Sequence, residues 1–206
     1  VTTIGKSAFE ECKYIYSVHL PESIERLEEQ AFYNSKVSVI NFPSNLKYIG
    51  SRALAFSQIK SVEGLSDNTY IEPYAFACCP NLERFVVPHY WTSVGGFSGC
   101  IKLKEIILPP TITHIESSAF NGCTNLNSVI FEKGSKLKCV DVLAFFENQT
   151  LEEIDFSNCS SLAKISKKAF LRASKLKSVI FAENNNLKEI GERAFIATGV
   201  KEVYFN

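Results

Sequence analysis

The stretch Ala119-Phe120-Asn121-Gly122-Cys123-Thr124-Asn125-Leu126-Asn127-Ser128-Val129-Ile130-Phe131 decides the fold of this chain. Its pattern, A-F-x-x-C-x-x-L-x-x-V-x-F, returns with substitutions from one end of the 206 residues to the other. Self-similarity at a nearly fixed spacing is the sequence signature of a repeat protein. The stretch is therefore the repeating unit, and the architecture follows from how one unit covers the next.

The position of Phe120 sets the period, and we call the residues that occupy it markers. The markers are Phe9, Phe32, Leu54, Phe76, Phe97, Phe120, Phe145, Phe170 and Phe195. Consecutive markers lie 21 to 25 residues apart, and the last three steps are 25 residues each. The sequence therefore predicts a solenoid of about nine coils in a single domain, residues 1–206.

Each coil is predicted to hold two short extended segments. Val129 and Phe131 are two residues apart, which places both side chains on one face of a strand. A second apolar site, such as Ile115, lies five residues before most markers, but no such residue precedes Phe97. Phe120 and Cys123 are three apart, so we expect them on one side of a helical turn.

This repeat pattern resembles that of the BspA-like leucine-rich repeat family, also called the Treponema pallidum type. Ile115, Ala119, Phe120, Cys123 and Leu126, with Val129 and Phe131, carry the resemblance, which extends over essentially all residues. It implies an α/β leucine-rich repeat solenoid with a parallel β-sheet on the concave side and short strands and turns opposite. The family occurs on bacteria and some parasitic protists and includes adhesins.

Charge and composition narrow the function classes. Lys plus Arg and Asp plus Glu both number 22, and the charges are scattered. This balance argues against a dedicated binder of nucleic acid or anionic membranes, which would carry a basic stripe. No apolar run is long enough for direct membrane insertion. The chain has no recognisable capping segment at either end, so we expect it to be a piece of a longer protein.

The outward side chains of the first strand in each coil are the main candidate binding residues. They alternate with the buried ones along the strand and would line the concave sheet. In four consecutive coils they are Arg84, Val86, Glu105, Ile107, Ser128, Ile130, Glu153 and Asp155. Val86, Ile107 and Ile130 would form an exposed apolar ladder, which suits an interaction site. Ordinary cross-strand pairing of β-branched residues would give the same pattern.

A second candidate is the irregular stretch before Phe97, where the shortest step falls. It contains His89, Tyr90 and Trp91, the last being the sole tryptophan of the chain. Tyrosine and tryptophan are favoured residues at binding hot spots. The alternative is that Tyr90 and Trp91 fill the space left by missing residues in a short coil.

The seven cysteines are predicted to be free, buried thiols. Cys12, Cys79, Cys100 and Cys123 share the position three after the marker, where other coils carry a small or polar residue. Free cysteine suits a small buried site. Disulfides between neighbouring coils stay open as an alternative, because they depend on the Cβ directions. Asn148 and Asn158 each begin an N-x-S/T sequon, which matters only if a eukaryote exports the protein.

Catalysis finds no support in the sequence. The chain has three histidines and no G-x-S-x-G, H-E-x-x-H or phosphate-loop motif. It also has no C-x-x-C pair, so a zinc site is not expected. We therefore predict no enzyme activity, no metal and no cofactor.

Two functions remain. The first is a surface or secreted recognition module that binds a host or extracellular-matrix protein through the concave sheet and residues 86–97. This hypothesis rests on the resemblance, and a rigid arc with a varied surface suits it. The second is a structural spacer or an intracellular scaffold, which buried free thiols and a neutral charge fit equally well.

Overall fold

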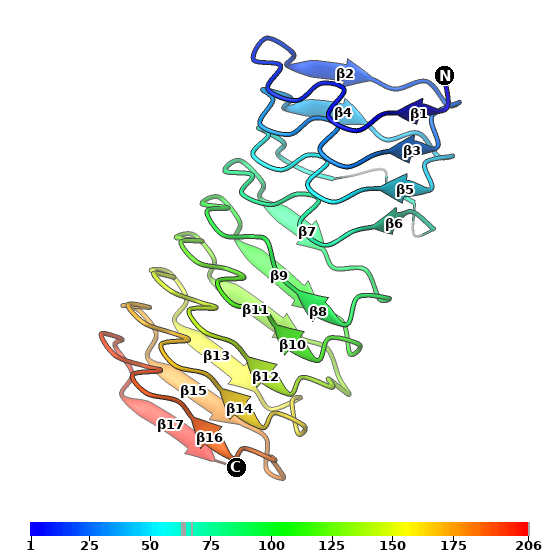
Figure 1. Cartoon of the computed structure of the whole chain (residues 1–206). Coiled ribbons are helices and arrows are strands. Elements are labelled where there is room, and N and C mark those ends of the chain that lie inside the picture. The colour runs from blue at the N-terminus through cyan, green and yellow to red at the C-terminus, as the bar shows by residue number, and fades with distance from the viewer. Residues whose placement is uncertain (63–64, 67, 206) are drawn as a thin grey trace.

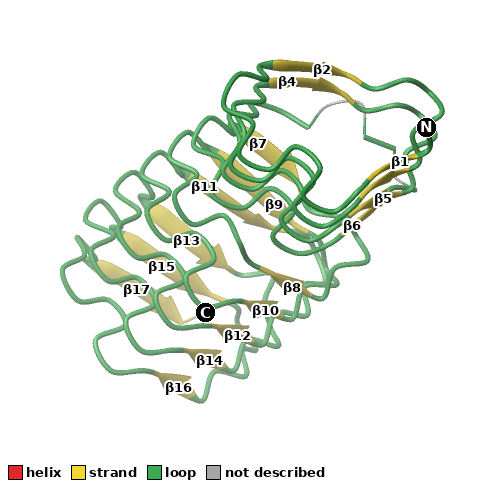
Figure 2. Cartoon of the chain, turned by 45° about the horizontal axis from the view of Figure 1, so that its top comes forward, coloured by secondary structure: helices red, strands yellow, loops and turns green. Residues whose placement is uncertain are grey.

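The computed structural model describes residues 1–62, 65–66 and 68–205 as a continuous stack of coils that share one hydrophobic core (Figure 1). Each coil contributes strands that pair in parallel with the coils before and after it. Figure 2 shows the longer strands along one side of the stack and the shorter strands along the other. The predicted leucine-rich repeat solenoid is confirmed.

The longer strands form the side that we call the long-strand face. They are β2 (Ser17–His19), β4 (Val39–Asn41), β7 (Arg84–Val86), β9 (Glu105–Leu108), β11 (Ser128–Phe131), β13 (Glu153–Phe156), β15 (Ser178–Phe181) and β17 (Glu202–Phe205). They make three parallel ladders, β2–β4, β7–β9–β11 and β13–β15–β17. The register follows the repeat, since Val129 pairs with Ile106 and Val179 with Ile154.

Two-residue strands form the opposite side, which we call the short-strand face. They are β1 (Thr3–Ile4), β3 (Arg26–Leu27), β5 (Tyr48–Ile49), β6 (Tyr70–Ile71), β8 (Ser93–Val94), β10 (His114–Ile115), β12 (Cys139–Val140), β14 (Lys164–Ile165) and β16 (Glu189–Ile190). They form two ladders, β1–β3–β5–β6 and β8–β10–β12–β14–β16. The ladder is interrupted between β6 and β8.

The α part of the predicted class is wrong, because the described residues contain no helix. Around every marker except Phe97, the turn is bent by residues with positive φ two places before and two places after the marker; at Phe97 the first of them is Gly96, one place before it. At Phe145 these residues are Leu143, with φ of 58°, and Glu147, with φ of 56°. A right-handed helix needs negative φ throughout, so a helical turn cannot persist across this position.

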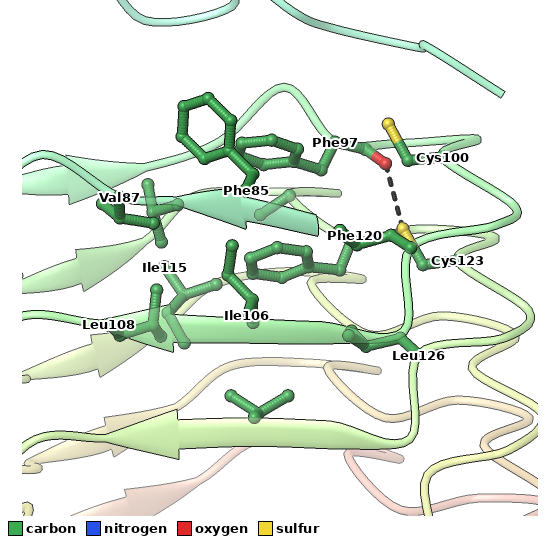
Figure 3. Packing of buried hydrophobic residues seen from close by; sticks show 14 of the residues in the cluster. Phe85, Val87, Phe97, Cys100, Ile106, Leu108, Ile115, Phe120, Cys123 and Leu126 are labelled. Carbon is green, nitrogen blue, oxygen red and sulfur yellow. Dashed lines mark hydrogen bonds between the residues drawn. The ribbon is translucent and has the colours of Figure 1, made fainter. Parts of the chain in front are cut away.

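Stacked markers form the centre of the core. Phe120 is fully buried, and its ring lies 5.7 Å from that of Phe97 and 5.3 Å from that of Phe145. Phe145 and Phe170 continue the stack at 5.0 Å. These separations match the spacing of paired strands, because each ring rides on a coil that is hydrogen-bonded to the next. Figure 3 shows Phe97 and Phe120 of this stack, with Ile106 and Leu126 near them.

The position three after the marker has a specific hydrogen-bonding role. The thiol of Cys123 donates to the carbonyl oxygen of Phe97 at 3.0 Å, drawn as the dashed line in Figure 3. Cys79 donates likewise to Leu54 at 3.2 Å, and the side-chain amide of Asn148 donates to Phe120 at 2.7 Å. In these three coils the site holds a donor that reaches the marker carbonyl of the preceding coil, whereas Ala173 fills the same site without a donor.

All seven cysteines are free thiols, and the prediction that they are buried holds for four of them. Cys12, Cys78 and Cys139 are only half-buried. Burial raises the pKa of Cys79 and Cys123 to about 12, which keeps both thiols protonated and unreactive at neutral pH.

The break between β6 and β8 is bridged by side chains, and we call residues 68–97 the seam. In the regular coils, backbone N–H groups of one coil donate to the preceding coil, as Lys138 does to Thr113 at 2.8 Å. At the seam, the equivalent carbonyl of Thr69 accepts from the Tyr90 hydroxyl at 3.1 Å. That of Ile71 accepts from the Trp91 indole N–H at 2.8 Å. Two aromatic side chains thus replace the missing strand pairing.

The short-strand pattern does not fail before Phe97, contrary to the sequence analysis. Val94 is fully buried and pairs with Ile115. It was missed because it lies three residues before its marker instead of five. The Phe stack is altered here as well, since Phe85 packs 5.6 Å from Phe76 and 5.0 Å from Phe97.

Candidate functional site

An exposed apolar row runs across the long-strand face. Val86 of β7, Ile107 of β9 and Ile130 of β11 are direct cross-strand partners in the parallel register. Val86 is 72% exposed and Ile130 is 41% exposed, while Ile107 between them is half-buried. The side chains on either side of each in sequence point inward and are buried. The structure therefore brings the three predicted residues together on one surface.

A polar row runs parallel to the apolar row, two residues earlier on each strand. Arg84, Glu105 and Ser128 are cross-strand partners, and the Arg84 guanidinium lies 3.5 Å from the Glu105 carboxylate. The next long strand, β13, adds the exposed residues Glu153 and Asp155. Strand β13 follows β11 directly in the stack, so all eight predicted strand residues lie on one continuous face.

The face becomes acidic toward its C-terminal end. Glu153 accepts a hydrogen bond from Ser178 at 2.8 Å, and Asp155 is exposed beside it. On β17, Glu202 accepts a hydrogen bond from the Tyr204 hydroxyl at 2.7 Å, which raises the pKa of Tyr204. The surface thus offers apolar contact in its middle and carboxylates at one end.

The irregular stretch does not join this face. His89 is exposed in the turn after β7, and Tyr90 is 42% exposed but stacks on Tyr70 of the short-strand face at 5.2 Å. Trp91 is only 6% exposed, and its indole is hydrogen-bonded within the seam. Trp91 is therefore a core residue that fills the short coil, and it does not lie on the long-strand face.

Sequence reasoning missed a polar recess beside the long-strand face. It has a volume of about 400 Å³ and is lined by Glu83, Lys102, Lys104, Asn125, Asn127 and Thr150. Lys104 and Asn127 directly precede β9 and β11, so the recess borders the two rows. The residue directly before each long strand from β4 to β17 is polar, and that periodicity is the signal in the sequence.

The sequon at Asn148 is inaccessible to solvent in the folded chain. Asn148 is fully buried, and its amide nitrogen, the atom that would carry a glycan, donates to Phe120. Asn158 is exposed, and its amide donates to the carbonyl of Phe131 at 2.9 Å.

Within the described residues, no group of three or more His, Cys, Asp or Glu side chains is arranged to hold a metal ion. Over the same residues, no helix has the length and apolar character needed to cross a bilayer.

Comparison with solved structures shows the same architecture in bacterial proteins. A leucine-rich repeat protein from Bacteroides ovatus is 26% identical, with a TM-score of 0.76, and the alignment covers 98% of this chain and 58% of that one. A leucine rich cell surface protein from Faecalibacterium prausnitzii is 21% identical, with a TM-score of 0.61, covering 99% and 57%. The pneumococcal vaccine antigen PcpA is 22% identical, with a TM-score of 0.65, covering 99% and 56%.

The chain thus spans somewhat more than half the length of each of these structures. The comparison with curated proteins finds no match. The sequence profile of the BspA type leucine rich repeat region matches residues 1–96 and 92–206, in six copies. Together, the profile, the stacked markers and the parallel ladders show that this chain belongs to the BspA-type leucine-rich repeat family.

Proposed function

We propose that this chain is a non-catalytic protein-recognition module of a cell-surface or secreted protein, and that it binds a host or extracellular-matrix protein through the long-strand face. The observation that carries the proposal is the apolar row Val86–Ile107–Ile130, aligned in register and exposed beside charged side chains. Apolar patches rimmed by polar residues are typical of protein-binding sites.

The chemistry of the face favours a partner with its own apolar patch next to basic groups. From β7 to β17, the outward positions of the two rows hold the carboxylates of Glu105, Glu153, Asp155 and Glu202 and a single guanidinium, that of Arg84. Such a distribution steers a basic surface toward the C-terminal half of the face. Contact with the apolar row then supplies affinity by burial.

The fold suits this role because the face is rigid. Cross-strand pairing fixes the position of each outward side chain, and the stacked Phe markers hold the coils beneath it. A surface that is already ordered loses little conformational entropy on binding. The surface location draws on two structures of similar fold, the Faecalibacterium cell surface protein and the pneumococcal antigen.

Binding of the purified chain to immobilised extracellular-matrix and plasma proteins would test the proposal. Val86→Glu and Ile107→Glu place a charge in the apolar row and are expected to weaken binding at least tenfold. Val142→Glu is the matched control, because Val142 is 40% exposed in a turn away from the long-strand face. It is expected to bind like the unmodified chain.

Equal loss in all three variants, or no loss in either row variant, would contradict the assignment of the site. Failure of the unmodified chain to bind any protein of the panel would contradict the recognition role. The spacer or scaffold would then become the better explanation.

A further inference from the structure

A second surface of interest lies on the short-strand face, at the seam. Tyr48 of β5 and Tyr70 of β6 stack with ring centroids 6.2 Å apart, and Tyr70 stacks on Tyr90 at 5.2 Å. The three rings form a column along the direction in which the coils stack. The Tyr90 hydroxyl is already used within the seam, since it donates to Thr69 and accepts from the N–H of Ile71.

One end of this column carries a guanidinium from the chain itself. The guanidinium carbon of Arg26 lies 4.0 Å from the centroid of the Tyr48 ring, within cation–π distance. The same guanidinium pairs with the Glu28 carboxylate at 2.6 Å, and this hydrogen bond raises the pKa of Arg26. The protein thus shows how an arginine, an aromatic face and a carboxylate combine on this surface.

The other end of the column is open. Tyr90 remains 42% exposed although one ring face lies on Tyr70, and because its hydroxyl is used, the exposed part is mainly the ring. Next to it is a recess of about 280 Å³ lined by Tyr70, Pro73, Tyr90, Trp91, Thr92 and Ser93. Its walls are largely aromatic.

A carboxylate is hydrogen-bonded to one of the residues that line the recess. Glu116 accepts hydrogen bonds from Ser93, one of the lining residues, at 2.6 Å, and from the Tyr74 hydroxyl. Gly95 leaves room for this carboxylate, because a Cβ at Gly95 would come within 2.3 Å of its Oε2 atom. The negative charge is therefore held in place by contacts from two coils.

We propose that the recess at the seam binds an arginine side chain of a protein partner, with the guanidinium against the exposed part of the Tyr90 ring and the edge of Tyr70, and its charge balanced by Glu116. This site would be distinct from the long-strand face and does not depend on the function proposed for that face. A guanidinium is favoured because it is planar, weakly hydrated and able to stack on an aromatic ring while it donates to a carboxylate.

The sole tryptophan gives a direct readout of the site. Because Trp91 is the sole tryptophan, its indole N–H produces the single indole cross-peak in a ¹H–¹⁵N correlation spectrum of the whole chain. Trp91 also lines the recess, so this peak reports on binding there. Titration with argininamide is expected to move this peak in a saturable manner in the millimolar range. Citrullinamide, which has the same shape without the charge, is expected to move it at least threefold less at equal concentration.

Substitutions distinguish the contributions of the aromatic ring and of the carboxylate to argininamide binding from an effect on folding. Tyr70→Leu removes the ring on which Tyr90 stacks and whose edge lines the recess, and is expected to weaken argininamide binding about three- to tenfold. Glu116→Gln keeps a hydrogen-bond acceptor without the charge and is expected to weaken it by a similar factor. Tyr14→Leu, at a residue 90% exposed in a distant turn, is the control and should bind like the parent chain.

The proposal is overturned if argininamide gives no saturable shift, or if citrullinamide shifts the indole peak equally. It is also overturned if the Tyr70 and Glu116 variants, shown to be folded by their spectra, bind argininamide as well as the parent chain does. A saturable shift with a neutral disaccharide, and none with argininamide, would assign the recess to carbohydrate instead.

Discussion

The coils after Phe97 and the seam before it achieve the same continuity by different means. From β8 to β16, each short strand donates backbone hydrogen bonds to the one before it, and the marker rings stack face to face. Between β6 and β8, the Tyr90 and Trp91 side chains make these hydrogen bonds, and Phe85 lies between two markers.

This difference shows what the repeat requires. The carbonyls at the edge of β6 are buried and need donors, but the donors need not come from a strand. A coil that is too short for regular strand pairing is tolerated because the large aromatic side chains of Tyr90 and Trp91 both fill the core and donate the missing hydrogen bonds. The regular coils should therefore depend on packing, and the seam on a few specific hydrogen bonds.

The largest effect is expected in the regular coils. Phe120→Ala should lower the free energy of unfolding by about 3–5 kcal/mol, because it removes a fully buried ring that contacts the coils on both sides. Urea unfolding followed by circular dichroism would measure it. Phe120→Leu is the control, because leucine is the natural marker residue at position 54. It should lower the free energy of unfolding clearly less than Phe120→Ala does. A loss below about 1 kcal/mol for Phe120→Ala would show that stacking does not hold the coils together.

At the seam, Trp91→Phe should cost about 1–3 kcal/mol, because the carbonyl of Ile71 loses its donor while staying buried. Tyr90→Phe removes the hydroxyl that serves Thr69 and Ile71 and should cost about 1 kcal/mol. The same urea experiment applies, with Tyr16→Phe, at a residue 59% exposed, as control. If all three variants unfold alike, the side-chain bridge is not what stabilises the seam.

Alkaline pH should weaken the seam. The hydrogen bond to Glu116, together with burial, raises the pKa of Tyr74 from 10.0 to about 12. Because the folded pKa is the higher one, this stabilisation is complete below pH 10 and is lost as the pH rises toward 12. Tyr74→Phe should therefore show a shallower fall of the urea midpoint between pH 10 and 12 than the parent chain. An unchanged slope would contradict this, and Tyr14→Phe should keep the parent slope.

The smallest effect is expected for ion pairs between regular coils. Lys177 Nζ lies 2.8 Å from Glu152 Oε2, and this hydrogen bond lowers the pKa of Glu152, but both side chains are more than half exposed. Lys177→Ala should change the free energy of unfolding by less than about 0.5 kcal/mol, and less still at high salt. A loss above about 1 kcal/mol would give these pairs a structural role that we do not expect.

The sequence predicts the regular coils well because one simple physical rule repeats there. Every 25 residues an apolar residue must face the core, so the positions of Ile154 and Val179 predict the register in which β13 pairs with β15. The outward rows of the candidate site follow from the same alternation. Their ligand does not follow, because it depends on a partner surface.

The seam and the turns were not predictable in the same way. The sequence leaves open whether Trp91 is a surface hot spot or fills the short coil, and only the three-dimensional position of the Ile71 carbonyl decides for the second. The sequence predicts helical turns, because residue types such as Leu143 and Glu147 do not indicate a positive φ. The neighbouring coils impose that conformation through hydrogen bonds such as that from Glu147 to Leu171.

The positive-φ turns also determine which mutations the protein can accumulate. Among the residues that the structure describes, fifteen non-glycine residues adopt this conformation, including Arg52, Phe56, Leu143 and Ala197, and none of these fifteen is Val, Ile, Thr or Pro. Charge, size and aromaticity vary freely there, whereas branching at Cβ is excluded because it is strained at positive φ. A combinatorial library of new coils could therefore randomise both turn positions widely, provided that its codons omit those four amino acids.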